Sequence, residues 1–403
     1  MKKVLFSLLF ILFAAPVIAG GPFFVDRGGN GTPTLWANNN VGWMADPGPL
    51  SAAVDNAKAV GWIQELFRIW RGAALSNAGG TPINVANLKS TYYGFAGEDV
   101  TVSNYLSVID AAYDKGLAVV IFDTDGSIVD AELGTNSKKY VVGFSSPVAN
   151  GGAYFGGGVV VLNGLFVDGD KKASGEVGEE EFKAAVLHEL GHLLNLDHTQ
   201  ANIEALERAR EGDLSLMDEI PTMFPILYSK DQLTLHTDDV ISLAEQYPSQ
   251  EYKDNFCTIT GELKDTNGEG FQGADVVARS LEADSEWSDV RTVVSGVFYP
   301  EGTLNGSYVL GGLIPERRYV IGYRGVDEMF TGGSNVAPFD PPKSSIVPGV
   351  INADVVACEA GGKAAQMGEA KVDDPGAAAT ASGSTESNFD STAPSGGCSL
   401  IPR

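Results

Sequence analysis

The chain has 403 residues, of which 44% are hydrophobic, and it carries 52 acidic against 27 basic side chains, a formal net charge of −25. This length is sufficient for two domains with tails. The acidic balance argues against binding to nucleic acids and to anionic membrane surfaces.

The segment Met1–Ala19 has the pattern of a secretory signal peptide. Lys2 and Lys3 provide a positive start, and the apolar run Val4–Ala15 is too short to span a bilayer. Val17 and Ala19 form an acceptable small-residue cleavage site. The pattern predicts export from a bacterium and cleavage after Ala19. Export in turn permits disulfides.

Apolar periodicity predicts the elements that follow. A helix is expected over Ser51–Ala74 with Ser51 as its N-cap, and a weaker one over Thr101–Gly116. Short apolar runs predict strands over Leu117–Phe122, Tyr140–Phe144 and Gly156–Leu162.

Two acidic residues, Asp123 and Asp125, follow the first of these strands in the sequence DTDG. Carboxylates at this spacing offer the hard oxygen ligands that calcium prefers. An Asx turn at the end of a strand is the equally favoured alternative. Asp168 and Asp170 also offer oxygen ligands, but a solvated loop is the better interpretation for them.

The most informative segment is Ala184–Gln200, AAVLHELGHLLNLDHTQ, because it contains three of the four histidines of the chain. Apolar residues at three- and four-residue spacing predict a helix over Glu179–Leu194, with three glutamates in its first turn. His188 and His192 are four residues apart and therefore project from one face, where two neutral imidazoles can hold one zinc ion. Glu189 is placed to act as general base for a water molecule.

A third ligand is available if the helix ends near Asn195. Asn tolerates the left-handed backbone conformation that reverses the chain, and His198 then comes back toward the other two histidines. The alternative is a core helix whose histidines only pack or cap. The extension of HExxH to a third histidine favours the zinc interpretation.

HELGHLLNLDH resembles the zinc motif of metzincin peptidases, HExxHxxGxxH, and is most similar to the matrixin branch. The resemblance implies His188, His192 and His198 as zinc ligands and Glu189 as general base, with Asn195 in place of the usual Gly. It also implies an edge strand that pairs with extended substrate, assigned to Gly156–Leu162, and calcium binding at Asp123 and Asp125. The propeptide cysteine and the second, structural zinc of animal matrixins have no counterpart here.

The resemblance extends downstream. Metzincins place a Met in a tight turn beneath the zinc, and Met223 in Pro221–Pro225 fits this role better than Met217. A short surface helix is expected over Ala201–Gly212. A closing helix is expected over Leu235–Tyr247, with Thr237 as N-cap and His236 as a surface or capping residue.

From Cys257 onward the pattern changes to short alternating runs separated by turn signals, which predicts a β-sandwich. Thr258–Ala357 resembles carboxypeptidase-regulatory-like, or transthyretin-like, domains, which implies a spacer or adhesion role. Cys257 and Cys358 flank the domain, and a disulfide between them is favoured over two free thiols. The strand-like runs are TITGELKD, GADVVARS, GVFYP, GSYVLGGL and RRYVIGYRG.

The composition of Gly361–Gly397 is that of a flexible linker. Gly396, Gly397 and Cys398 are similar to the start of the carboxy-terminal sorting signals of some Gram-negative bacteria, which implies surface attachment through Cys398. The hydrophobic helix and basic end that normally follow are not in the sequence.

The predicted fold class is α+β: a catalytic domain containing a mixed sheet with an antiparallel edge strand and a long active-site helix, followed by an all-β sandwich. The predicted function is that of a secreted, monomeric zinc endopeptidase acting on protein or peptide. The alternative is a non-catalytic adhesion protein on the same scaffold, which the presence of Glu189 and all three histidines disfavours. The predicted regions are 1–19, signal peptide; 20–249, peptidase; 256–360, sandwich; and 361–403, tail.

Overall fold

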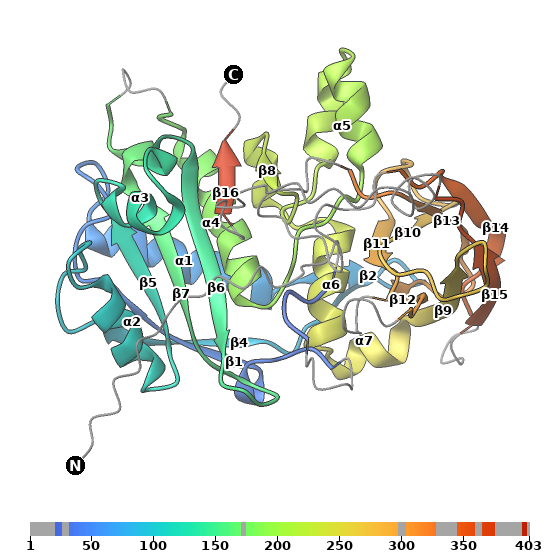
Figure 1. Ribbon diagram of the computed structural model, residues 1–403, viewed down its shortest axis with the longest axis horizontal. Coiled ribbons are helices and arrows are strands. Elements are labelled where there is room, and N and C mark those ends of the chain that lie inside the picture. Colours follow the sequence, from blue (N-terminus) through green and yellow to red (C-terminus); the bar gives the residue numbers. More distant parts are fainter. Residues whose placement is uncertain are drawn as a thin grey trace.

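The computed structural model describes residues 21–25, 32–170, 175–296, 304–327, 345–358, 365–374 and 397–400. The predicted signal peptide lies outside these residues, as do most of the predicted tail and all of the run GVFYP except Gly296. Figure 1 shows a large sheet covered by helices on one side of the molecule and a pair of smaller sheets on the other. Among the described residues, none of the helices has both the length and the apolar character needed to cross a membrane.

The large sheet has seven strands in the order β4-β1-β5-β7-β6-β16-β8. Its first four strands run parallel, whereas β6 runs antiparallel to β7. The bounds are β1 Asn40–Ala45, β4 Lys89–Phe95, β5 Ala118–Asp123, β6 Val141–Ala149, β7 Phe155–Asn163, β8 Ile226–Leu227 and β16 Gly397–Leu400.

Helices cover both faces of this sheet, because strands buried on both sides expose alternate apolar residues to each face. Val120 and Leu162 face one core, which contains α1 (Asn56–Arg71) and α4 (Glu179–Leu193). Val119 and Val161 face the other, which contains α2 (Tyr105–Tyr113) and α3 (Ser127–Leu133). The remaining helices are α5 Ile203–Arg210, α6 Thr237–Gln246 and α7 Gln250–Asn255. Short 3-10 segments are Ala37–Asn39, Ser137–Lys139, Gly164–Val167, Leu214–Glu219 and Lys230–Leu233.

The predicted substrate-pairing strand is assigned wrongly. β7, which contains Gly156–Leu162, lies inside the sheet between β5 and β6. Its residues from Gly157 onward are buried, as expected for an interior strand. The antiparallel strand β6 lies on the other side of β7 from β5, and it is the strand that contacts α4 and pairs with β16.

Two predicted helix caps are also wrong. α1 begins five residues later than expected, with Asp55 as its N-cap, because the Ser51 hydroxyl instead accepts from the amides of Ala53 and Val54 in a preceding turn. α6 has His236 rather than Thr237 at its N-cap, and the Asp239 carboxylate accepts from the His236 amide at 2.8 Å.

The second part of the chain contains two sheets, β11-β10-β13-β14 and β12-β9-β15, with a shared apolar core. A disulfide joins Cys257 and Cys358, whose Cα atoms are 6.1 Å apart, as predicted. The bounds are β9 Cys257–Lys264, β10 Asp275–Ser280, β11 Val290–Val294, β12 Ser307–Leu313, β13 Arg318–Arg324, β14 Gly349–Val356 and β15 Ala365–Lys371. The separate hairpin strands are β2 Ala74–Ser76 and β3 Pro82–Asn84.

The expectation of a flexible tail from residue 361 is wrong for β15. This strand runs parallel to β9 and completes the smaller sheet. Met367 and Ala370 pack against the core, and Val372 is buried just beyond the strand. A few apolar residues spaced through a polar segment were therefore enough to place it in the sheet.

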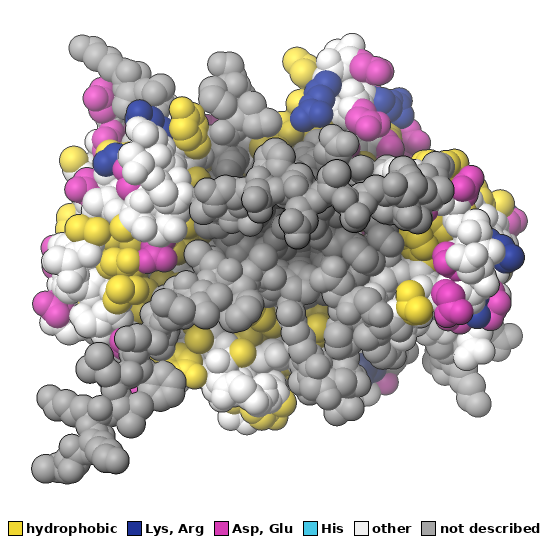
Figure 2. Space-filling model, in the orientation of Figure 1, with side chains coloured by type: hydrophobic (Ala, Val, Ile, Leu, Met, Phe, Trp, Pro, Cys, Tyr) yellow, Lys and Arg dark blue, Asp and Glu magenta, His cyan; other side chains and the backbone are white. Residues whose placement is uncertain are grey.

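The helix α5 connects the two parts rather than lying on a free surface. Ile203, Ala205 and Leu206 belong to the same buried cluster as the core of the two smaller sheets. The polar side of α5 is exposed, and Figure 2 shows both basic and acidic side chains over it. The chain just after the third histidine is thus packed against the second part.

Candidate metal centre

The helix α4 carries two of the predicted ligands and is almost entirely buried from Ala184 to its end. Glu181 accepts from the Gly178 amide at 2.9 Å and so caps the first turn, as the run of glutamates predicts. Indole groups fix the helix from outside: Trp70 Nε1 donates to Leu187 O at 3.0 Å, and Trp36 Nε1 donates to Leu193 O at 2.7 Å. The histidines are therefore held on a rigid element.

The chain reverses at Asn195, as predicted. Asn195 has φ of 73°, the left-handed region, directly after the helix. His198 consequently returns to the face of α4 that carries His188 and His192. All three imidazoles are buried, with at most 2% of each residue exposed.

The ring nitrogens of the three histidines converge. His198 Nε2 lies 3.2 Å from His188 Nε2 and 3.2 Å from His192 Nε2. In the described part of the chain, these are the only three His, Cys, Asp or Glu side chains whose ligand atoms all lie close enough, within 4.8 Å, to share an ion. The set can hold one metal ion.

Hydrogen bonds from the Nδ1 atoms to backbone carbonyl oxygens fix the tautomers of the two histidines on α4. His188 Nδ1 lies 2.7 Å from Thr222 O, and His192 Nδ1 lies 2.9 Å from Leu196 O. Because a carbonyl oxygen only accepts, each Nδ1 carries the proton and each Nε2 presents a lone pair to His198. Two lone pairs directed at one point in a buried site are best satisfied by a cation.

Burial also keeps these imidazoles neutral. It lowers the pKa of His188 to about 4, against the opposing effect of its bond to Thr222 O. It lowers the pKa of His192 well below the usual value, and the nearby His188 acts in the same direction. Neutral imidazole is the form that binds metal.

Glu189, the predicted general base, is buried on the same helix next to His188. It lies against β6: a Cβ placed on Gly143 would be 3.4 Å from Glu189 Cγ. The Glu189 side chain therefore lies against β6, on the same helix as His188 and His192.

Met223 packs against α4, where its sulfur is the nearest atom to a Cβ built on Gly191, and its role as the Met of a turn beneath a metal stays a prediction. Its backbone oxygen accepts from Thr199 N at 2.9 Å, which ties the turn to the residue after the third histidine. Asp239 accepts from Met223 N at 2.9 Å and from Thr222 N at 3.0 Å, so the start of α6 holds the turn in place. Met217 lies in a 3-10 segment and packs against the second core instead.

The two aspartates predicted to bind calcium accept hydrogen bonds from backbone amides at the start of α3. Asp123 Oδ2 accepts from Val129 N at 2.8 Å, and Asp125 Oδ1 accepts from Ser127 N at 3.0 Å. Burial raises the pKa of Asp123, whereas hydrogen bonding to Ser127 lowers the pKa of Asp125. These contacts support the Asx-turn interpretation, and calcium binding here stays a prediction.

Sequence reasoning missed what Asn195 does beyond turning the chain. Its side chain accepts from Phe24 N at 2.6 Å and donates to Phe24 O, Thr34 O and the Gln246 side chain at 2.9–3.0 Å. The Asn195 carbonyl accepts from Phe23 N at 2.8 Å. The amide thus fastens the N-terminal segment and α6 to the end of α4, which a Gly could not do.

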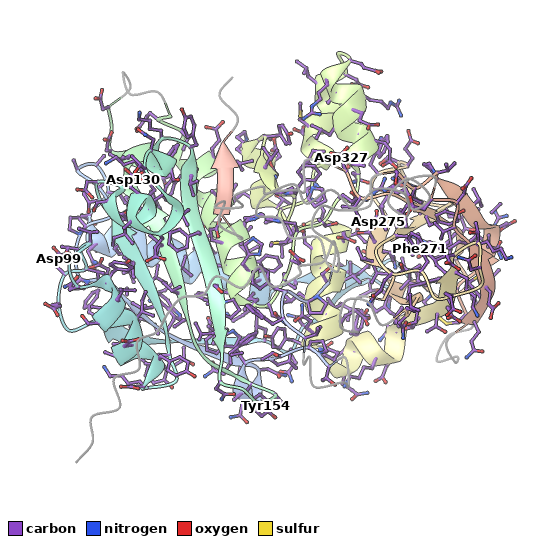
Figure 3. All side chains as sticks on the ribbon, in the orientation of Figure 1. Asp99, Asp130, Tyr154, Phe271, Asp275 and Asp327 are labelled. Carbon is purple, nitrogen blue, oxygen red and sulfur yellow. A yellow bond between two sulfur atoms is a disulfide. The ribbon has the colours of Figure 1, made fainter. Side chains whose placement is uncertain are left out.

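The segment after His198 is bound to the smaller sheets by buried polar contacts. Gln200 Nε2 donates to Asp275 Oδ2 at 2.7 Å, and Arg324 Nε donates to the same oxygen at 2.8 Å. Figure 3 places Asp275 where the two parts meet. Thr199 Oγ1 lies 3.2 Å from Thr292 Oγ1. No short motif signals the contacts of Gln200 with Asp275 and of Thr199 with Thr292, because these partners are 75 and 93 residues apart in the sequence.

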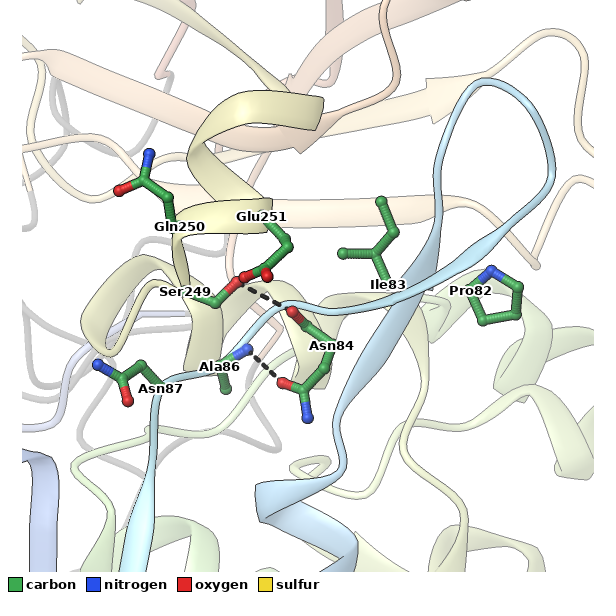
Figure 4. A pocket seen from close by; sticks show the side chains of 8 residues that line it. All are labelled: Pro82, Ile83, Asn84, Ala86, Asn87, Ser249, Gln250 and Glu251. Carbon is green, nitrogen blue, oxygen red and sulfur yellow. Dashed lines mark hydrogen bonds between the residues drawn. The ribbon is translucent and has the colours of Figure 1, made fainter.

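A pocket of about 500 Å³ lies away from this site, between β3 and the start of α7 (Figure 4). Its polar groups are already engaged: Ser249 Oγ donates to Asn84 O at 2.9 Å, and Asn84 Oδ1 accepts from Ala86 N at 3.1 Å. It contains none of the predicted site residues. The predicted metal ligands lie at the three histidines, outside this pocket.

The predicted attachment residue, Cys398, lies in β16, where its backbone pairs with Gly143 of β6. Attachment through it stays a prediction. Comparison of the sequence with protein-family models and with curated proteins returned no match. The function is therefore inferred from the residues of the site themselves.

Proposed function

We propose that the chain is a zinc-dependent endopeptidase of the metzincin type. The observation that carries the proposal is the convergence of three buried imidazoles, two of them on the helix that also carries the buried Glu189. Two nitrogens bound to one tetrahedral zinc at about 2.0–2.1 Å lie roughly 3.3–3.4 Å apart. The observed Nε2 separations of 3.2 Å agree with that geometry.

The residues around the ligands support the same chemistry. A zinc ion supplies the Lewis acidity that activates water and polarises a peptide carbonyl. Glu189 accepts the proton of the attacking water and delivers it to the leaving amine. Thr222 O and Leu196 O orient His188 and His192 through their Nδ1 protons. Met223 and Asp239 support this arrangement from below.

Export fits this proposal. The signal-peptide pattern of Met1–Ala19 predicts it, and the Cys257–Cys358 disulfide suits an oxidising compartment. Thr199 and Gln200, which follow His198, contact the second part of the chain. We therefore propose that the second part helps to position the third ligand, in addition to any binding of partners.

The proposal is tested by measuring bound zinc and casein hydrolysis in one preparation, beside Glu189→Ala. We expect one zinc per chain in both proteins and a loss of kcat of about 100-fold or more in the variant, the usual effect of removing a general base. Glu180→Ala is the matched control, since Glu180 is exposed on the first turn of the same helix.

Equal activity in the parent and Glu189→Ala would refute the mechanism. A folded parent protein that binds no zinc and cleaves nothing would favour the alternative, a non-catalytic adhesion protein.

A further inference from the structure

A short strand of the chain itself, β16, lies beside the metal centre. It comprises Gly397–Leu400 and lies between β6 and β8 (Figure 1). It runs antiparallel to β6, with Cys398 opposite Gly143, and parallel to β8, with Leu400 opposite Leu227. The backbone of this segment is therefore paired on both sides.

The position of β16 along β6 brings it to the predicted general base. Gly143, the partner of Cys398, is the β6 residue whose Cβ would lie 3.4 Å from Glu189 Cγ. β16 also contacts α4, the helix that carries His188, Glu189 and His192. The backbone around Cys398 thus lies next to both the strand that Glu189 contacts and the helix that carries Glu189.

The space that β16 occupies is a slot whose two walls are β6 and β8, and both walls adjoin the elements that carry the three histidines and Met223. β6 flanks α4, and β8 starts directly after the turn that contains Met223 and Pro225. β16 separates β6 from β8 in the strand order. Paired strands are about 4.8 Å apart, so the slot is roughly 10 Å wide between its walls and admits one extended strand. Recognition through main-chain hydrogen bonds is a usual way to hold an extended peptide.

We propose that Gly397–Leu400 occupies the peptide-binding slot of the metal centre and competes in cis with extended peptide substrates. The inference rests on the proposed function for its consequence, although the occupancy itself does not need catalysis. A segment of the same chain competes at an effective concentration on the order of millimolar. Weak backbone pairing is then sufficient to exclude a dilute substrate.

Occupancy is tested by binding, in zinc-loaded Glu189→Ala protein so that no probe is cut. One version ends at Gly396 and lacks the segment, and the matched control ends at Leu400 and keeps it. The probe is a fluorescein-labelled peptide, SGGCSL, corresponding to Ser395–Leu400. We expect fluorescence anisotropy to show binding to the shorter version at least tenfold tighter than to the control. Equal affinity for both versions, or binding to neither, would overturn the proposal.

A second probe separates backbone pairing from binding of the thiol to the metal. The same peptide with Cys398→Ser retains its backbone donors and acceptors, and we expect its affinity for the shorter version to stay within threefold. Loss of binding on this change would show that pairing with β6 and β8 does not hold the segment, contrary to the proposal.

With Glu189 intact, we expect removal of residues 397–403 to lower KM for a peptide substrate at least tenfold while kcat changes less than twofold. The unlabelled peptide should inhibit the shorter enzyme competitively and be recovered intact by mass spectrometry. An unchanged KM, or recovery of a cut peptide, would contradict competition in cis. If no version hydrolyses any substrate, the proposed function fails, and the anisotropy measurement still decides whether the segment fills the slot.

Discussion

Gly191 and Met223 are packed so closely that a Cβ on Gly191 would collide with the Met223 sulfur. The ring of Trp70 lies 3.0 Å from the same Cβ position, so the neighbouring side chains leave no room for a methyl group there. Gly191 precedes His192 directly, and the absence of a side chain there lets the turn approach the underside of α4. The packing of one glycine thus sets the distance between the helix and the turn below the three histidines.

Gly191→Ala should therefore destabilise the protein, although Ala in a helix is ordinarily favoured over Gly by about 1 kcal/mol. Overpacking a buried site costs about 1–3 kcal/mol, and the displaced helix should also weaken metal binding. Thermal unfolding and zinc content measure the two effects. Gly61→Ala in α1 is the matched control, because nothing lies within 4 Å of its added Cβ. We expect it to raise the unfolding temperature, and a similar rise in Gly191→Ala would refute the packing argument.

The side-chain hydrogen bonds and left-handed backbone of Asn195 imply an order of stability among variants at this position. Asn195→Gly keeps the left-handed turn but removes the side-chain bonds to Phe24, Thr34 and Gln246. The four bonds contribute about 1 kcal/mol each, so we expect a loss of about 4 kcal/mol in the free energy of unfolding. Asn195→Ala additionally forces a Cβ into the left-handed region, at about 1 kcal/mol more. Urea unfolding of the three proteins should give the order Asn, Gly, Ala, and a Gly variant as stable as the parent would contradict this role.

The convergence of the three histidines could be predicted from the sequence because its determinants are local. Helical periodicity, the spacing of His188 and His192, and a residue suited to the turn at Asn195 all lie within one short segment. The buried strand β5 and the disulfide Cys257–Cys358 were predicted for similar reasons: a continuous apolar run, and two cysteines flanking one domain.

The features that sequence reasoning missed depend on distant partners. The order of β6 and β7 in the sheet depends on their other partners, since β7 also pairs with β5 and β6 also pairs with β16. β15 is polar apart from a few residues, and it forms because β9 offers an edge. The polar contacts of Gln200 with Asp275 leave no pattern in the residues around either one.

Removal of metal should lower the stability of the folded chain. His188 and His192 direct lone pairs toward His198, and a ligand that binds only the folded state stabilises it by about 4 kcal/mol at 1,000 times its Kd. We expect treatment with a chelator to lower the unfolding temperature and zinc to restore it. His198→Ala should abolish the response to zinc, and His236→Ala should keep it, since His236 lies at the N-cap of α6 with its ring against Asp218 O and is not one of the three converging histidines. Restoration by calcium alone would point instead to a site of oxygen ligands such as Asp123 and Asp125.

Asp238 should make stability depend on pH near neutrality. It is buried at the start of α6, where its Oδ1 accepts from Thr292 N at 2.7 Å across the contact with β11. Burial, with Asp239 and Asp275 nearby, raises its pKa from 3.8 to about 7, although hydrogen bonds from Thr199 and Thr292 oppose the shift. The folded state therefore holds a proton that the unfolded state has released between these pH values. Stability from this group is fully present below pH 3.8 and is lost as the pH rises to about 7.

Asp238→Asn tests this directly, because the amide oxygen can still accept from Thr292 N while no charge forms. One pKa unit corresponds to about 1.4 kcal/mol, so the parent should lose on the order of 4 kcal/mol between about pH 4 and pH 7 through this group. Urea unfolding at several pH values should show a shallower decline in the variant. Asp114→Asn, at the exposed end of α2, removes the same charge without burial and should leave the decline unchanged. Parallel pH profiles for parent and Asp238→Asn would mean that Asp238 stays ionised in the folded chain, and that its neighbours compensate the charge across the interface.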